Sequence, residues 1–196
     1  MIHARSHRFV VAVAFALVVS APCRHAFAQA PDPQAIAAQK EAMKSLSIFD
    51  GTWRGPAWIL MPGGEKLDVT QTERVGSFLD GGVKVIEGRG YDASGNVAFN
   101  AFGIVSYDAA KKTYSLRTYA MGRVGDFPLT TSADGFSWEH LMGPITIRYT
   151  ATIKNGEWHE VGERMVKGQP PVKFMEMTLK RIGDSDWPAG GAVPAK

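Results

Sequence analysis

Asp50-Gly51-Thr52-Trp53 is the stretch at which the pattern of the chain changes. Before it, residues 34–46 are rich in Ala, Gln, Lys and Glu and follow Pro33, which predicts a short helix. After it, apolar residues recur with a period near two, and turn signals rich in Gly, Pro, Asn and Asp return every eight to twelve residues or so. We therefore expect a short helix followed by a long series of strands.

The turn signals divide the chain after Thr52 into about ten strand-like segments. We expect strands at 52–60, 66–75, 83–91, 97–107, 113–121, 124–131, 136–141, 145–154, 157–166 and 172–182. Short hairpin turns join them without helical crossovers, so each strand must pair antiparallel with the next. Closure into an up-and-down barrel removes exposed sheet edges and leaves an interior for a small ligand. The predicted fold class is all-β: an up-and-down antiparallel barrel of about ten strands with a short N-terminal helix.

Several short motifs in the chain resemble one group of proteins. They are Gly51-Thr52-Trp53, the turn at 79–82, Tyr91-Asp92, Tyr107-Asp108 and the closing segment 177–181. Together they resemble a secreted bacterial family of unknown function in the calycin superfamily, a relative in fold of lipocalins, fatty-acid-binding proteins and nitrobindins. The resemblance implies a lipocalin-like barrel in which Trp53 packs against Arg181 across one closed end. Such a cation–π contact would contribute on the order of 1 kcal/mol.

The first residues have the composition of a secretory signal peptide. Arg5 and Arg8 precede the apolar run 9–19, and Ala26-Phe27-Ala28 is a small-x-small cleavage site. The apolar run is too short to span a bilayer, which needs roughly twenty residues. We expect residues 1–28 to be removed and the mature protein to lie in the periplasm or be secreted, without a membrane span.

The alternative for this segment is a lipoprotein anchored through Cys23. Pro22 stands immediately before that cysteine, which does not fit the lipoprotein signal. In the mature chain we expect a tail and short helix at 29–45, one barrel domain at 46–182, and a C-terminal tail at 183–196 whose Trp187 packs on the surface.

The removed segment also carries the surplus of positive charge. The whole chain has a formal net charge of +3, but residues 1–28 contain Arg5, Arg8 and Arg24 and no Asp or Glu, so the mature chain has as many basic as acidic residues. This balance gives no support for a nucleic-acid partner. Loss of Cys23 also excludes disulfides and cysteine-ligated metals. We expect a monomer or weak homodimer whose partner is a small molecule.

Ligand selection should depend on the inward faces, which alternate along each strand. In 83–91 we assign the face of Glu87 and Arg89 to the interior. In 157–166 both faces carry charged as well as large side chains, and we assign the face of Trp158 to the interior. The predicted ligand-binding residues are Glu87, Arg89, Trp138, His140, Tyr149, Trp158, Glu160, Arg164, Met175 and Met177.

Enclosed charges are costly unless they are paired, which leaves two interpretations of the interior. One is a network of salt bridges that fills the barrel. The other is a polar end to an apolar pocket, where Arg and Tyr receive the anionic or hydroxyl group of a ligand. The expected function is an exported barrel that binds a small amphipathic or aromatic molecule, with the arginines holding the glutamate pKa values low.

Two other functions remain open. A small barrel enzyme of isomerase, cyclase or decarboxylase type could use Glu87 and Glu160, with Tyr149 or His140 assisting. A haem-binding barrel would need one histidine ligand, and only His140 and His159 lie beyond the signal peptide.

The sequence contains no recognisable catalytic or metal-binding motif. No catalytic residue, metal site or cofactor is predicted. Arg117-Thr118-Tyr119 resembles the carboxylate-binding Arg-x-Tyr of fatty-acid-binding proteins and should place both side chains on one face, but it lies in the middle of the barrel and not on its last strand.

Overall fold

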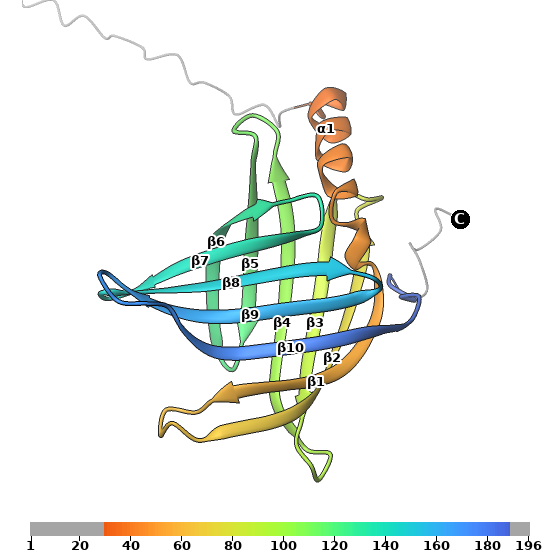
Figure 1. The fold of residues 1–196 in the computed structure, drawn as a ribbon. Helices are drawn as coiled ribbons and strands as arrows, with labels where there is room; N and C mark the ends of the chain where they lie inside the picture. The colour runs from red at the N-terminus through yellow and green to blue at the C-terminus, as the bar shows by residue number, and fades with distance from the viewer. Residues whose placement is uncertain (1–29, 189–196) are drawn as a thin grey trace, which may run out of the picture. The chain divides into compact units, whose positions relative to one another are not determined.

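A computed structural model describes residues 30–188 of the chain, and ten antiparallel strands form a closed barrel in it (Figure 1). Each strand pairs with its neighbour in the sequence, and β1 closes the barrel against β10. The strands are β1 (Gly51–Leu60), β2 (Lys66–Phe78), β3 (Val83–Tyr91), β4 (Val97–Asp108), β5 (Thr113–Ala120), β6 (Arg123–Thr131), β7 (Gly135–Met142), β8 (Ile145–Lys154), β9 (Glu157–Val166) and β10 (Val172–Gly183). The predicted fold class is confirmed.

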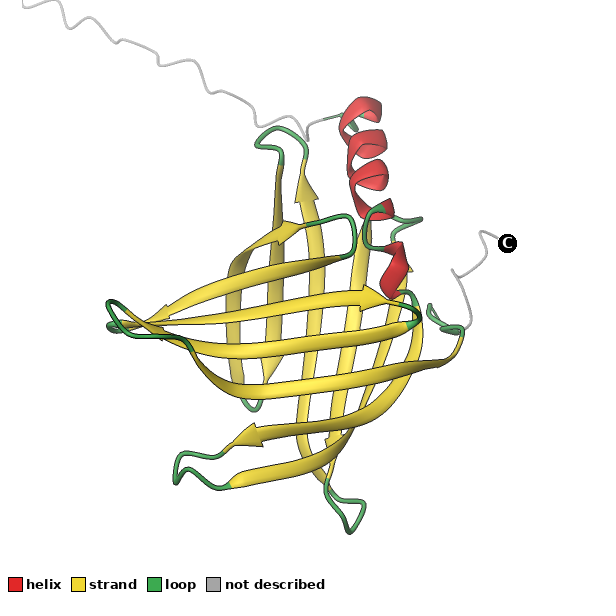
Figure 2. Cartoon of the chain, viewed as in Figure 1, coloured by secondary structure: helices red, strands yellow, loops and turns green. Residues whose placement is uncertain are grey.

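One helix precedes the barrel, as Figure 2 shows. α1 (Pro33–Lys44) begins after Asp32, whose side chain accepts hydrogen bonds from the backbone N–H groups of Gln34 and Ala35 at 2.9 and 3.2 Å. The 3-10 turn η1 (Ser47–Phe49) follows it and leads into β1. Within residues 30–188, no helix has the length and hydropathy needed to cross a membrane. The predicted signal peptide lies outside the described residues.

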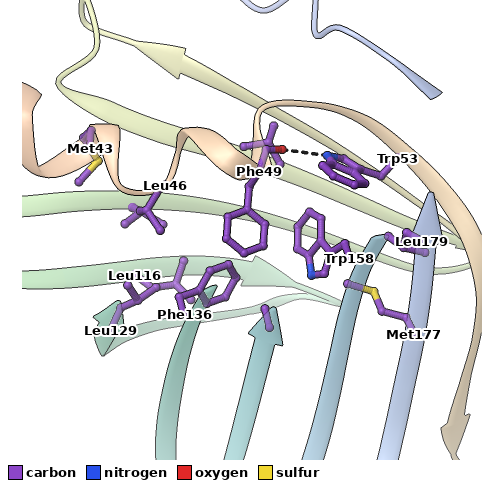
Figure 3. Close-up of a cluster of buried hydrophobic side chains, with 13 residues drawn as sticks. Met43, Leu46, Phe49, Trp53, Leu116, Leu129, Phe136, Trp158, Met177 and Leu179 are labelled. Atoms are coloured by element: carbon purple, nitrogen blue, oxygen red, sulfur yellow. Dashed lines mark hydrogen bonds between the residues drawn. The ribbon is translucent and has the colours of Figure 1, made fainter. Parts of the chain in front are cut away.

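Aromatic residues pack at the closed end of the barrel, beside η1 (Figure 3). Trp53 is 1% exposed, and its indole N–H donates a hydrogen bond of 2.8 Å to the backbone oxygen of Phe49. Trp158 packs edge-on against both rings, with centroid distances of 5.8 Å to Trp53 and 4.8 Å to Phe49. Edge-to-face packing of this kind adds to the hydrophobic gain from burial.

The surroundings of Gly51 explain why a glycine stands two residues before Trp53. Gly51 has a φ of 128°, and a Cβ there would lie 2.7 Å from the backbone oxygen of Gly183 and 2.8 Å from Nε of Arg181. Arg181 is the register partner of Trp53 across β1 and β10. Its guanidinium, however, is partly exposed and donates hydrogen bonds to the backbone oxygen of Asp50 and to Asp184. These hydrogen bonds take the place of the expected stacking on the indole.

A buried lysine fixes η1 to the barrel wall. Lys84 on β3 is 2% exposed, and its ammonium lies 2.5 Å from the carboxylate of Asp50. The same group donates hydrogen bonds to the hydroxyls of Ser77 and Ser47 at 2.7 and 3.3 Å. These bonds satisfy all three N–H groups of the ammonium, so its charge is neutralised where it lies.

Trp187 packs on the outer surface, as expected. Its ring lies 6.0 Å from that of Phe78, and the guanidinium of Arg74 lies 5.4 Å above it. A Cβ at Gly76 would lie 2.8 Å from Cβ of Trp187, so the bare glycine lets the segment after β10 lie flat on β2.

Candidate ligand-binding cavity

The barrel encloses a cavity of about 420 Å³. Pockets of a few hundred cubic ångströms are the usual size for sites that hold a small molecule. The lining is mainly aliphatic and aromatic, and it comes from nearly every strand. It includes Ala57, Ile59, Val69, Ile86, Phe99, Ala101, Leu116, Thr118, Phe136, Trp138, Tyr149, Trp158, Met175 and Met177.

The cavity opens at the end of the barrel opposite α1. Met61 lies in the turn between β1 and β2, Met121 lies in the turn between β5 and β6, and both line the cavity. Their side chains are also exposed to solvent, by 41% and 61%. The inner end is formed by Phe136 and Trp158, which belong to the buried cluster beside η1. The cavity therefore runs from two methionines with flexible side chains at its opening to an aromatic inner end.

A stack of aromatic rings on three adjacent strands forms one side of the cavity or supports it from behind. Trp138 on β7 and Tyr149 on β8 are register partners, and their rings stack nearly parallel with centroids 4.3 Å apart. Phe127 on β6 packs against the same indole at 4.8 Å. Burial raises the pKa of Tyr149 to about 12, so its hydroxyl is a neutral hydrogen-bonding group at physiological pH.

Two carboxyl groups lie among these apolar residues: Glu73 on β2 and Glu160 on β9. Glu73 is 9% exposed, and one of its oxygens accepts a hydrogen bond of 2.7 Å from the side-chain amide of Gln71. Glu160 accepts a bond of 3.2 Å from the indole N–H of Trp158. Each carboxyl has one neutral donor, which is weak compensation for burying a negative charge.

Both carboxyl groups consequently hold their protons more tightly than usual. Burial raises the pKa of Glu73 to about 8, and the nearby charges of Glu160 and Glu87 add to this while the Gln71 hydrogen bond opposes it. Burial also raises the pKa of Glu160 to about 7, against the opposing effect of the Trp158 hydrogen bond. The expectation that arginines hold the interior glutamate pKa values low is therefore wrong.

Glycines on β3 make room for the polar side chains of β2. A Cβ at Gly88 would lie 2.5 Å from Oε1 of Glu73, and one at Gly90 would lie 3.0 Å from Oε1 of Gln71. The inward face of β3 is therefore that of Lys84, Ile86, Gly88 and Gly90. The interior space beside β3 is already occupied by Gln71 and Glu73, so only small residues fit on that part of its inner face.

The assignment of Glu87 and Arg89 to the interior is wrong for this reason. Both lie on the outer face of β3, where they form an ion pair of 2.5 Å with side chains 28% and 48% exposed. An exposed pair of this kind contributes little to stability. Arg164 does share the inward side of β9 with Glu160, but it is exposed and its guanidinium lies 5.2 Å above the ring of Phe174.

The remaining predicted residues are brought together by the fold. The face of Trp158 on β9 points inward, as assigned, and six predicted residues line the cavity: Trp138, Tyr149, Trp158, Glu160, Met175 and Met177. Their role in binding stays a prediction. Glu73 was missed, although Leu67, Val69 and Val75 share its period-two register along 67–75 and mark that face as inward.

Neither histidine beyond the predicted signal peptide lines the cavity. His140 packs against Trp138 and Phe127 at centroid distances of 5.8 and 5.3 Å, and burial lowers its pKa. Its Nδ1 is buried without a hydrogen-bond partner in the described part of the chain. His159 lies 3.0 Å from the carboxylate of Glu176 on the outer face. The geometry therefore offers no histidine of residues 30–188 to an iron inside the cavity.

Arg117 and Tyr119 share a face, as their spacing predicts, but it is the outer face of β5. Nε of Arg117 donates a hydrogen bond of 2.9 Å to the hydroxyl of Tyr119, and its Nη1 lies 3.0 Å from the carboxylate of Asp126. The resemblance to a carboxylate-binding Arg-x-Tyr pair therefore does not extend to the cavity.

The fold matches known structures, whereas no family model and no curated protein matches the sequence. Rv2717c from M. tuberculosis is similar with a TM-score of 0.55 at 13% identity, over 72% of this chain and 97% of that one. The S-type phycobiliprotein lyase CPES from Guillardia theta has a TM-score of 0.50 at 11% identity, over 78% of this chain and 100% of that one. At such low identity these matches show a shared barrel fold and no more.

Proposed function

We propose that the protein is an exported barrel that binds one small, largely apolar molecule in its interior. The observation that carries this proposal is the cavity of about 420 Å³, lined by aromatic and aliphatic side chains and open past Met61 and Met121. An apolar lining with a few polar groups at fixed positions is the general form of a small-molecule site. Export rests on the signal-like sequence of residues 1–28.

The polar groups suggest how such a ligand would be oriented. Its apolar body would lie against the stacked rings of Trp138 and Tyr149. Its polar end would reach Glu73 and Glu160 near the inner end of the cavity, where Trp158 closes the barrel. This arrangement replaces the expected arginine site, because Arg89 and Arg164 do not line the cavity.

A neutral apolar dye should test the proposal. We expect N-phenyl-1-naphthylamine to become fluorescent on binding to the wild type, and its affinity to fall by about tenfold or more in Ala101→Phe, because the new ring occupies cavity volume and displaces apolar contacts worth more than 1.4 kcal/mol. Asn100→Phe is the matched control, since Asn100 is the exposed neighbour on the same strand. Equal dye binding by both variants, with both folded by circular dichroism, would contradict binding in the cavity.

An acid–base enzyme is the second candidate function. The observation that favours it is a pair of buried carboxyl groups whose pKa values lie close to neutral, which is where a general acid or base works best. In this case Glu73 takes the place of Glu87 in the expected pair. Catalysis would differ from binding alone in that the bound compound is chemically changed by the wild type and left intact by Glu160→Gln.

A further inference from the structure

The charge of the cavity lining has one sign. Glu73 and Glu160 are the residues of the lining that can carry a charge near neutral pH, and no Lys, Arg or His of residues 30–188 belongs to the lining. Lys84, the one buried cation of residues 30–188, is already paired with Asp50. The guanidinium of Arg164 is exposed and lies over Phe174. A negative charge formed in the cavity therefore has no cationic side chain of residues 30–188 in the lining around it.

Aromatic rings line the same cavity as the two carboxyl groups. Trp158 donates its indole N–H to Glu160, and the stacked rings of Trp138 and Tyr149 line the wall next to it. The faces of aromatic rings attract cations, and the attraction grows when the site is shielded from water. Carboxylates and ring faces favour the same ligand charge, which is positive.

We propose that the cavity takes an apolar or aromatic amine, whose ammonium group lies between Glu73 and Glu160 and whose apolar body lies against Trp138 and Tyr149. This inference rests on the proposed binding function and names its ligand class. The ammonium supplies the cation that the lining lacks, and it gives the free oxygen of Glu73 a hydrogen-bond donor. An acid of the same shape would place a third negative group beside two carboxyls and is excluded by repulsion.

Binding of an amine should depend on pH in a defined direction. Besides burial, Gln71 on β2, Glu87 on β3 and Glu160 on β9 act on the carboxyl of Glu73, and the indole of Trp158 acts on that of Glu160. Tyr149 on β8 lies near the charges of Glu160 and Arg164. Below about pH 7 the carboxyls of the empty cavity are mostly protonated, so an arriving ammonium must displace a proton. Affinity for the amine should rise by about tenfold per pH unit for each proton displaced, and it should level off only above about pH 8, where both carboxyls are ionised.

Three naphthalene compounds of nearly equal size test the ligand class. Calorimetry at about pH 8 should show that 1-naphthylmethylamine binds about 30-fold more tightly than 1-naphthalenemethanol, because a close buried charge pair is worth roughly this much. The carboxylate 1-naphthaleneacetate should bind most weakly. If the alcohol or the acid binds as tightly as the amine, the inference is wrong while cavity binding stands. If none of the three binds, the proposed function fails as well.

Variants of the two carboxyls separate a charge effect from a folding effect. Glu160→Gln and Glu73→Gln should each lose about 30-fold in amine affinity and keep their affinity for the alcohol, which reports an intact cavity. Glu87→Gln is the matched control and should bind the amine as the wild type does, because Glu87 lies on the outer face. Unchanged amine binding in both cavity variants would overturn the inference.

Discussion

Glu73→Gln should make the protein more stable than the wild type at about pH 9, by on the order of 5 kcal/mol. Burial raises the pKa of Glu73 from 4.5 to about 8, because the carboxylate has only the Gln71 amide to replace its lost hydration. Glutamine has the same shape, can keep that hydrogen bond through its carbonyl oxygen, and never ionises. The variant therefore avoids a buried negative charge that the wild type must form at high pH.

The sign of the pH dependence follows from the two pKa values. Between about pH 4.5 and pH 8 the folded protein binds more protons than the unfolded chain, so wild-type stability falls as pH rises through this range and then stays level to about pH 9. The variant should equal the wild type at about pH 4. It should then lose stability only up to about pH 7, where Glu160 completes its ionisation.

Urea unfolding followed by tryptophan fluorescence at about pH 4, 6 and 9 measures this difference. Glu87→Gln is the control, because its carboxylate is partly exposed and paired with Arg89 on the outer face. Parallel stability curves for wild type and Glu73→Gln across the whole pH range would contradict the buried position of Glu73.

Trp53→Ala should lower the free energy of unfolding by about 3–5 kcal/mol, the usual cost of truncating a large buried aromatic residue. The indole is 1% exposed, contacts Trp158, and donates to the backbone oxygen of Phe49, so its loss leaves a hole and an unpaired oxygen beside η1. In a domain of this size the melting temperature should fall by roughly 10 °C.

Trp58→Ala is the matched control for this variant, since Trp58 lies on the same strand and is only half-buried. Arg181→Ala should cost about 1 kcal/mol or less, because the guanidinium is partly exposed and its pairing with Asp184 lies at the surface. A melting temperature that Trp53→Ala leaves unchanged would show that the aromatic cluster does not hold the closed end together.

The turns and the alternation were sufficient to predict the barrel. Turn signals give strand boundaries within a few residues, and the period-two pattern of β8 correctly places Ile147, Tyr149 and Ala151 inward. Antiparallel neighbours then follow from hairpins too short for any other connection. The largest boundary difference is in β2, which continues to Phe78.

Alternation failed where polar side chains face the interior. On β3 we used alternation to assign the face with the larger residues to the interior. The interior face instead carries Gly88 and Gly90, because the side chains of β2 fill that space. The pairing register decides which of two neighbouring strands fills the interior space with large side chains, and the sequence of a single strand does not contain that information. Glu73 was missed for another reason, because the alternation of Leu67, Val69 and Val75 along its own strand already marks its face as inward.

Methionine methyl groups give the most direct test of ligand binding inside the barrel. Met175 and Met177 line the cavity, Met61 and Met121 stand at its opening, and the other described methionines lie outside its lining: Met43, Met142 and Met165. With carbon-13 methyl labels, adding 1-naphthylmethylamine should shift the four lining and opening resonances and leave the other three in place. Shifts confined to Met142 and Met165, or no shift at a ligand concentration that saturates binding, would contradict a ligand site in the interior.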